Sequence, residues 1–169
     1  MTSGEVVVRS AEPGDEGAIA DTLARAFDRD DETVLVHRLK NTGAVVASLV
    51  AEVSGVVVGH ALVSRVAASI DGRRVEVTAL SAVCVRPTHR RRGIGTRLVE
   101  VAIGRATEAG AEAVVVFGEA GFHSRFGFSR GRARVFAPGR PGDALQALEI
   151  VPGALSGESG TVDFPRADD

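Results

Sequence analysis

The sequence predicts an α+β fold built on a central mixed, mostly antiparallel sheet, and three observations support this fold class. Two β-rich runs, residues 45–53 and 56–65, flank the hairpin turn Ser54-Gly55. The apolar run AVVVFG (113–118) is typical of a strand buried on both faces. An amphipathic helix predicted over 95–109 precedes that run and follows a glycine-bearing loop. Strand, loop, helix and buried strand form a β-α-β unit attached to the antiparallel strands.

The N-terminal elements are predicted to be a strand followed by helices. Residues 6–9 form a short β-branched run, which favours a first strand. Pro13 then suits the first turn of a helix, where its missing N–H costs nothing. Apolar residues follow it at helical spacing: Ile19, Leu23 and Phe27. A second short amphipathic segment, 34–39, favours another helix before the hairpin.

A third antiparallel strand is predicted over 73–85, between the turn Asp71-Gly72 and Pro87. The helix over 95–109 places its apolar residues on one face, namely Leu98, Val99, Ala102, Ile103 and Ala106. Gly110 suits the end of this helix, because glycine readily adopts the left-handed conformation that closes a helix.

The C-terminal part carries weaker patterns. Residues 127–136 and 145–151 favour two further strands, joined by a loop at 138–142. Residues 161–169 are expected to be loosely ordered. A chain of 169 residues (1–169) is expected to form a single domain, with a core that spans about residues 5–155.

Composition and charge exclude several classes of protein. Apolar content of 44% and charged content of 25% are ordinary for a soluble globular protein. The net charge of -2 gives no overall attraction to nucleic acid or membrane, and no apolar run reaches the ~18 residues of a membrane span. Cys84 is the only cysteine, which excludes an intramolecular disulfide and suits a reducing cytoplasm. The N-terminus lacks the pattern of a signal peptide, so a cytoplasmic location is expected.

The segment RPTHRRRGIGT (86–96) is the candidate for binding chemistry, because it joins the third long strand to the amphipathic helix. Gly93 and Gly95 permit positive φ and let another molecule approach the backbone. The free N–H groups and the dipole at the helix start favour an anion. Three arginines, Arg90, Arg91 and Arg92, add positive charge that can pair with phosphate oxygens. Such a turn suits a phosphate or pyrophosphate; a plain strand-to-helix connection is the alternative.

Other nucleotide-binding motifs fit this loop poorly. A P-loop needs lysine after its second glycine, and the only lysine, Lys40, lies elsewhere. A dinucleotide-binding fingerprint needs a third small residue three positions after Gly95, where Leu98 stands. Association with RNA or the ribosome through residues 86–97 is opposed by the net charge and by the lack of interleaved aromatic residues.

The residues of this segment resemble a known family. LSAVCVRPTHRRRGIGTRL is similar to the acetyl-coenzyme A signature of the GNAT N-acetyltransferase superfamily, a strand ending in apolar-x-Val-x-Pro followed by Arg/Gln-x-x-Gly-x-Gly/Ala. The second part of that signature falls on Arg90, Gly93 and Gly95. The segment VVVFGEAGFHSRFGF resembles the YhbS-like branch, whose members typically carry Tyr-Tyr-x-Arg-Phe-Gly-Phe there. The resemblance covers about residues 6–155.

The resemblance implies the GNAT fold, with helices on both faces of the sheet and a β-α-β unit whose strands splay apart. Acetyl-CoA would be the cosubstrate, its pantetheine arm lying in that gap, and no metal is implied. Backbone groups of Val83 and Val85, with Cys84 between them, would hydrogen-bond the pantetheine like an added strand. The pyrophosphate would lie in the loop made by Arg90, Arg91, Arg92, Gly93, Ile94, Gly95 and Thr96. Because dimers are frequent in the family, a homodimer is a further expectation.

Acetyl transfer to an amine requires a stabilised oxyanion and benefits from a proton for the leaving thiolate. In the family, a backbone N–H of the strand commonly polarises the thioester carbonyl, which implies Val83 here. A tyrosine four residues before the Gly of the later Gly-Phe pair commonly donates the proton, yet this chain has no tyrosine. His123 occupies that position, and an imidazolium can donate a proton. The alternative is that His123 is a solvent-facing or capping residue and that water protonates the thiolate.

A general base for the amine is harder to identify. Glu76 on the third long strand and Glu119 after the buried strand are the two candidates, although surface carboxylates are common. His60 either lines the acceptor side or belongs to the core. Cys84 is a conceivable nucleophile, but a lone cysteine in an apolar strand is usually inert packing.

The sequence therefore predicts an acetyl-CoA-dependent N-acetyltransferase that acts on an amine of a small molecule or a protein. An acyl-CoA-binding regulatory or sensor module with little turnover is the alternative, because the usual tyrosine is missing and no base stands out. The acidic run DRDDE (28–32) favours a cationic acceptor amine, although a solvated loop explains it equally well.

Overall fold

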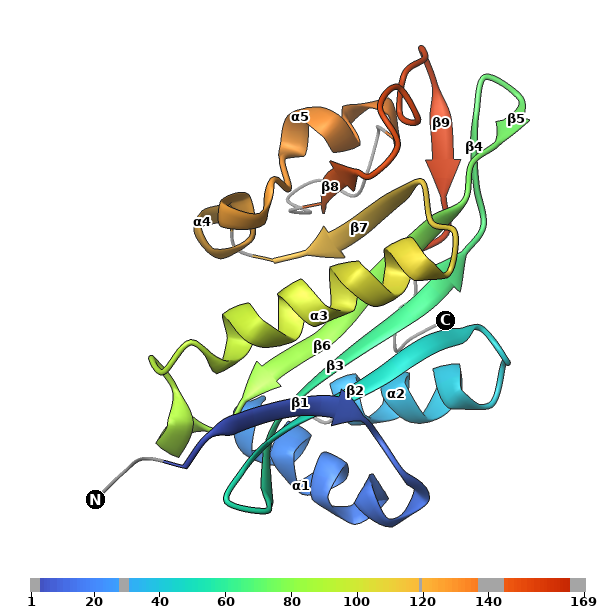
Figure 1. Cartoon of the computed structure of the whole chain (residues 1–169). Coiled ribbons are helices and arrows are strands. Elements are labelled where there is room, and N and C mark those ends of the chain that lie inside the picture. The colour runs from blue at the N-terminus through green and yellow to red at the C-terminus, as the bar shows by residue number, and fades with distance from the viewer. Residues whose placement is uncertain (1–3, 28–30, 119, 137–144, 165–169) are drawn as a thin grey trace.

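A six-stranded sheet forms the centre of the computed structural model, which describes residues 4–27, 31–118, 120–136 and 145–164 (Figure 1). The strands lie in the order β1-β2-β3-β6-β7-β8. Their bounds are β1 Val6–Ser10, β2 Val45–Val53, β3 Val56–Val66, β6 Val77–Val85, β7 Ala113–Phe117 and β8 Leu145–Glu149. Every neighbouring pair is antiparallel except β6 and β7, which are parallel. The prediction of a mixed, mostly antiparallel sheet is confirmed.

Helices cover both faces of this sheet, with α3 on one face and α1 and α2 on the other (Figure 1). These long helices are α1 Glu16–Ala26, α2 Asp31–Lys40 and α3 Ile94–Glu108. Because side chains alternate along a strand, β3 supplies residues to both layers. Ala61 and Val63 pack in the cluster that contains Leu98 of α3. Leu62 faces the opposite way and packs with Leu23 of α1.

The predicted helices are confirmed with small shifts at their ends. Pro13 begins a 3-10 turn, η1 (Pro13–Asp15), which leads directly into α1. The helix predicted over 95–109 starts one residue earlier and ends at Glu108. The helix predicted over 34–39 is longer in the structure, where α2 extends from Asp31 to Lys40.

A second, smaller sheet lies at one end of the molecule, and the sequence does not predict it (Figure 1). Its strands are β4 Ala68–Ile70, β5 Arg73–Arg74 and β9 Gly160–Val162, in the order β5-β4-β9. The strand predicted over 73–85 is wrong at its start. Asp71 and Gly72 both adopt positive φ, so the chain folds back and β5 pairs with β4. The long strand of the central sheet begins only at Val77.

The C-terminal tail contributes to the second sheet and to the core. Residues 160–162 pair with β4, and Phe164 is buried against Phe117 with ring centroids 4.4 Å apart. The expectation of loose order is therefore wrong for residues 161–164, because backbone pairing and aromatic packing hold them. Residues 165–169 lie outside the described part of the chain.

The segment 127–136 is mostly helical, so the strand predicted there is wrong. The short elements of this region are α4 Ala120–His123, η3 Ser124–Phe126, α5 Arg130–Ala133 and η4 Arg134–Phe136. Ser129 makes only an isolated bridge to Ala147, and its hydroxyl accepts a hydrogen bond from the N–H of Arg132 at 3.1 Å. This N-cap starts a helix where alternation of apolar residues favoured a strand. The second predicted strand is β8, and the loop at 138–142 lies outside the described residues.

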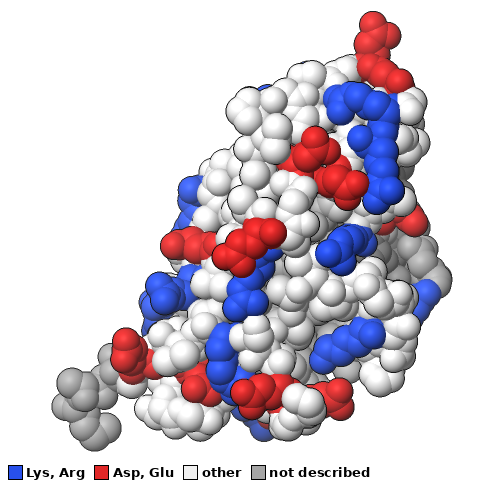
Figure 2. Space-filling model, turned by 45° about the vertical axis from the view of Figure 1, so that its right-hand side comes forward, with Lys and Arg blue, Asp and Glu red and all other residues white. Residues whose placement is uncertain are grey.

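Charged side chains of both signs are interspersed on the face of the molecule drawn in Figure 2. Among the described residues, no helix combines the length and apolar character needed to cross a membrane.

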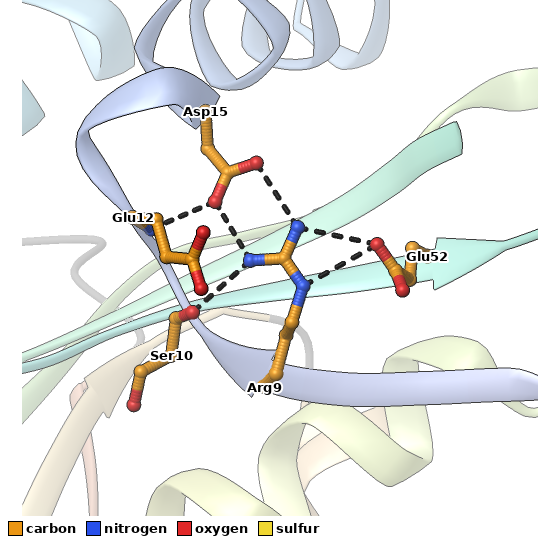
Figure 3. Close-up of polar contacts among 5 residues, drawn as sticks. All are labelled: Arg9, Ser10, Glu12, Asp15 and Glu52. Carbon is orange, nitrogen blue, oxygen red and sulfur yellow. Dashed lines mark hydrogen bonds and ion pairs between the residues drawn. The ribbon is translucent and has the colours of Figure 1, made fainter. Parts of the chain in front are cut away.

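An ion cluster ties β1 to the turn that precedes α1 and to β2 (Figure 3). The guanidinium of Arg9 donates to the carboxylate of Asp15 at 2.7 and 3.0 Å and to Glu52 at 3.2 Å. Asp15 also accepts the backbone N–H of Glu12 at 2.7 Å. The hydrogen bonds from Arg9, and then the one from Glu12, lower the pKa of Asp15 to about 2.

We expect this cluster to stabilise the fold at neutral pH but not in strong acid. The pKa of Asp15 is about 2 in the folded protein, whereas an unfolded aspartate titrates near ~3.9. The stabilisation is therefore complete above about pH 4 and is lost as the pH falls through the folded pKa. Replacing Asp15→Asn should lower the free energy of unfolding at pH 7, as measured by urea unfolding. At pH 2 the variant and the wild type should differ much less. Glu100→Gln, on the exposed face of α3, is the control; an equal Asp15→Asn deficit at both pH values would contradict the prediction.

Candidate active site

A cleft of about 1520 Å³ opens where β6 and β7 separate. The two strands pair only from Val77 to Leu80 on β6 and from Ala113 to Val116 on β7. Beyond Leu80, β6 continues to Val85 without a partner among the described strands on this side, and its residues line the cleft. The splayed β-α-β unit expected from the sequence is thus present, and it leaves one backbone edge of β6 facing the cleft.

A β-bulge lies in β6 at the beginning of this free edge. Ala82 has a φ of 51°, a left-handed conformation that is uncommon for a residue with a side chain. The pairing with β3 shifts at the same place, because Leu62 lies opposite Ser81 whereas His60 lies opposite Cys84. Such a bulge adds a residue to one strand and rotates the local peptide groups. Ser81, Ala82 and the residues up to Val85 all line the cleft.

The glycine-bearing loop forms one end of the cleft and continues into α3. Gly93 is the N-cap residue, with a φ of 79°, and offers no side chain to cap the helix. The first N–H groups of α3 are therefore left without a side-chain acceptor, which makes this helix start suited to an anion. The residues of this region that line the cleft are His89, Arg90, Arg91, Gly93, Ile94, Gly95 and Thr96. Arg92 is exposed and is not among them.

Arg90 holds the loop in place. Its Nε donates to the carbonyl oxygen of Val85 at 3.3 Å, and its terminal Nη2 donates to the carbonyl oxygen of Ala26 at 3.2 Å. The second contact places the positive charge at the C-terminal end of α1, which the helix dipole favours. Arg90 therefore connects β6, α1 and the loop while contributing positive charge to the cleft.

The cleft wall also includes His123, which is only 7% exposed. The rings of Phe122 and Phe128 pack edge-on against the imidazole, with centroids 5.1 and 5.9 Å away. A Cβ on Gly118 would lie 2.5 Å from Cε1 of His123, so only glycine allows the ring to lie there. The imidazole is thus buried in the cleft wall and does not face bulk solvent.

Glu76, one of the two candidates for the general base, lies away from the cleft. Glu76 is exposed, forms an ion pair with Arg74 at 2.9 Å, and precedes the end of β6 that is remote from the splay. It does not line the cleft, so the structure does not support Glu76 as the base. Glu119 lies outside the described residues.

Cys84 and His60 lie opposite one another on β6 and β3, and both are buried. Cys84 lines the cleft, but burial raises the pKa of its thiol to about 12. The thiolate needed for nucleophilic attack is thus disfavoured, as expected for a packing cysteine. His60 belongs to the core and is not among the residues that line the cleft.

Ser81 and Phe164 line the cleft, although the sequence did not predict them as site residues. Ser81 lies at the vertex of the splay, and Phe164 reaches the cleft from the tail. Asp31 and Glu32 line it from the start of α2, and these are the described members of the acidic run. Of these lining residues, only Asp31 and Glu32 belong to a pattern visible in the sequence, the acidic run. The position of Phe164 depends on pairing between β9 and β4, which no local pattern predicts.

Comparisons with known proteins match this chain along most of its length. The family model described as "Acetyltransferase (GNAT) domain" matches residues 7–131. The protein named "Uncharacterized N-acetyltransferase YhbS" of Escherichia coli (strain K12) is 30% identical over 162 residues, which is 94% of this chain and 96% of the relative.

Two crystal structures have similar folds. The YhbS N-acetyltransferase from Escherichia coli in complex with CoA has a TM-score of 0.86 and 28% identity, over 97% of this chain and 92% of that chain. A GNAT family acetyltransferase from Brucella melitensis in complex with acetyl-CoA has a TM-score of 0.79 and 27% identity, over 98% of this chain and 99% of that chain.

Proposed function

The chain belongs to the GNAT family of acetyltransferases, and we propose that its cleft brings acetyl-CoA and a cationic amine together for direct acetyl transfer. The observation that carries this proposal is the unpaired edge of β6 beyond Leu80, which ends at an uncapped helix start. An extended pantetheine arm can add to such an edge, and a pyrophosphate suits such a helix start. The relatives from Escherichia coli and Brucella melitensis, which bind CoA and acetyl-CoA, support the same ligand here.

In this proposal the cosubstrate is bound mainly by backbone groups. Val83 and Val85 would hydrogen-bond the pantetheine, with Cys84 packing between them. The N–H groups at the start of α3, from Gly93 through Thr96, would hold the pyrophosphate together with Arg90 and Arg91. Arg92 is exposed and is not a lining residue, so in this proposal it contributes only long-range charge.

The reaction breaks the thioester C–S bond and forms an amide C–N bond. The neutral amine nitrogen attacks the carbonyl carbon, and the backbone N–H of Val83 would stabilise the oxyanion that forms. Collapse of this intermediate expels the CoA thiolate, to which His123 would donate a proton. A base must remove the proton that the amine loses, and we retain Glu119 as the candidate because it directly follows Gly118 of the cleft lining.

The lining also indicates the class of acceptor. The carboxylates of Asp31 and Glu32 lie in the cleft wall formed by α2, beside Phe27 and Leu35. Negative charge at the entrance raises the local concentration of a cationic amine. Apolar neighbours suit the methylene groups of such an amine, so a polyamine or a lysine side chain fits the wall.

Release of free CoA thiol from acetyl-CoA in the presence of a panel of amines tests the proposed function. We expect turnover with polyamines and lysine peptides to exceed turnover with uncharged amines. Binding of acetyl-CoA by calorimetry without turnover on any amine would favour the regulatory or sensor alternative. No binding of acetyl-CoA to the folded protein would overturn the proposal.

We also infer that this activity operates in the reducing cytoplasm, which suits a chain whose single cysteine excludes an intramolecular disulfide. A homodimer remains our expectation from the family resemblance, and the molar mass in solution tests it.

A further inference from the structure

His60 lies in the middle of β3 and is fully buried, yet it contacts the bulge that borders the cleft. Its Nδ1 lies 3.3 Å from the carbonyl oxygen of Ala82. Because a carbonyl oxygen only accepts hydrogen bonds, this contact assigns the imidazole proton to Nδ1. Ala82 is the residue of β6 with the left-handed φ of 51°. The histidine therefore binds a peptide group of β6 that lies in the bulge.

Nε2, the second ring nitrogen of His60, does not explain why a histidine occupies this position. Nε2 is buried and has no hydrogen-bond partner among the described residues. Burial lowers the pKa of His60 to about 4, so the ring is neutral at pH 7 and Nε2 is an unsatisfied acceptor. Such a buried, unsatisfied group is costly, whereas a leucine would fill a similar volume without this cost. Within the described structure, the contact that distinguishes histidine from leucine is the bond from Nδ1 to Ala82.

The geometry of a peptide bond relates this contact to the reacting atoms. In a trans peptide, the C=O and the N–H point in opposite directions. The carbonyl of Ala82 points to the imidazole of His60, so the N–H of the same peptide, which belongs to Val83, points away from that imidazole. Ala82 and Val83 both line the cleft, where β6 has no partner among the described strands on the β7 side beyond Leu80.

We propose that His60 is a positioning residue for acetyl transfer, which holds the Ala82–Val83 peptide so that the N–H of Val83 is directed at the thioester oxygen. This inference rests on the acetyl transfer proposed above and on the role of Val83 in it. His60 touches neither substrate, and it acts only through the backbone of the bulge. A donor fixed before the substrate arrives needs no reorganisation as the oxyanion forms.

The variants that test this role differ in one hydrogen-bond donor. His60→Leu removes the donor and the unsatisfied acceptor, and His60→Asn keeps an N–H on the atom next to Cγ, as Nδ1 is. If His60→Leu does not fold, His60→Met replaces it, because methionine adapts to irregular space. Ser64→Ala is the matched control, since Ser64 is also a buried β3 residue whose side chain has no hydrogen-bond partner among the described residues.

The main measurement is the infrared stretch of the thioester carbonyl in acetyl-CoA labelled with carbon-13 at that atom. A hydrogen bond to this oxygen lowers the stretching frequency, so binding to the wild type should lower it. We expect His60→Leu to lose most of that shift and about tenfold in kcat with the best amine of the panel, while the Kd for acetyl-CoA stays the same. His60→Asn should recover both quantities, and Ser64→Ala should match the wild type.

A purely structural histidine predicts different results. His60→Leu would then change thermal stability without changing the carbonyl shift, and that outcome would overturn the inference. A loss of kcat that His60→Asn does not recover would also count against it. Failure of the wild type itself to bind acetyl-CoA would refute the proposed function instead, so the two failures are distinguishable.

Discussion

Replacing Gly93→Val should weaken acetyl-CoA binding roughly 100-fold. Gly93 has a φ of +79° at the N-cap of α3, a conformation that β-branched residues strongly resist. A Cβ at this position would meet no atom within 4 Å, so the effect arises from the backbone rather than from a clash within the protein. The loop must rotate to relieve the strain, which turns the first N–H groups of α3 away from the pyrophosphate. Loss of two charge-assisted hydrogen bonds amounts to about 3 kcal/mol, or roughly 100-fold in Kd.

Gly72→Val provides a matched control for this experiment. Gly72 has a φ of +80° and equally open surroundings, but it lies in the turn between β4 and β5, far from the start of α3 (Figure 1). Both variants should lose thermal stability, because each imposes the same backbone strain. Calorimetry with acetyl-CoA should detect weaker binding for Gly93→Val alone. An unchanged Kd for a folded Gly93→Val protein would show that the pyrophosphate does not bind at this loop.

Replacing His123→Phe should lower kcat about 100-fold and leave the Kd for acetyl-CoA nearly unchanged. Phenylalanine keeps a ring between Phe122 and Phe128 but has no proton to give to the thiolate. General acids contribute about 100-fold or more, and the lower end applies here because a thiolate is a tolerable leaving group. The effect should therefore appear in the chemical step and not in binding of the cosubstrate.

His123→Tyr separates proton donation from packing. Tyrosine differs from phenylalanine by one hydroxyl group, and the resemblance places a phenol at this position in related enzymes. We expect His123→Tyr to recover much of the kcat that His123→Phe loses, as measured by thiol release with the best amine. His37→Phe, on the exposed side of α2, controls for the general effect of exchanging histidine for phenylalanine. Wild-type kcat in His123→Phe across the pH range would show that water protonates the thiolate.

The sequence by itself determined the elements whose causes are local. The hairpin at Ser54-Gly55 follows from turn residues, and α3 follows from its apolar periodicity. The glycine-bearing loop before α3 was recognisable for the same reason, because Gly93 and its arginines are adjacent in the chain. The family resemblance then implied the splay of β6 and β7, which is present.

The tertiary structure alone decided which side chains meet, because contacts between distant segments leave no local pattern. Gly118 and the rings around His123 bury that imidazole in the cleft wall, whereas Glu76 precedes the end of β6 where β6 and β7 are still paired. Phe164 reaches the cleft through pairing of β9 with β4. The contact between His60 and Ala82 exists only because a bulge shifts the register of β6 against β3. Strand propensity could identify both strands, but it contains no information about a one-residue shift between them.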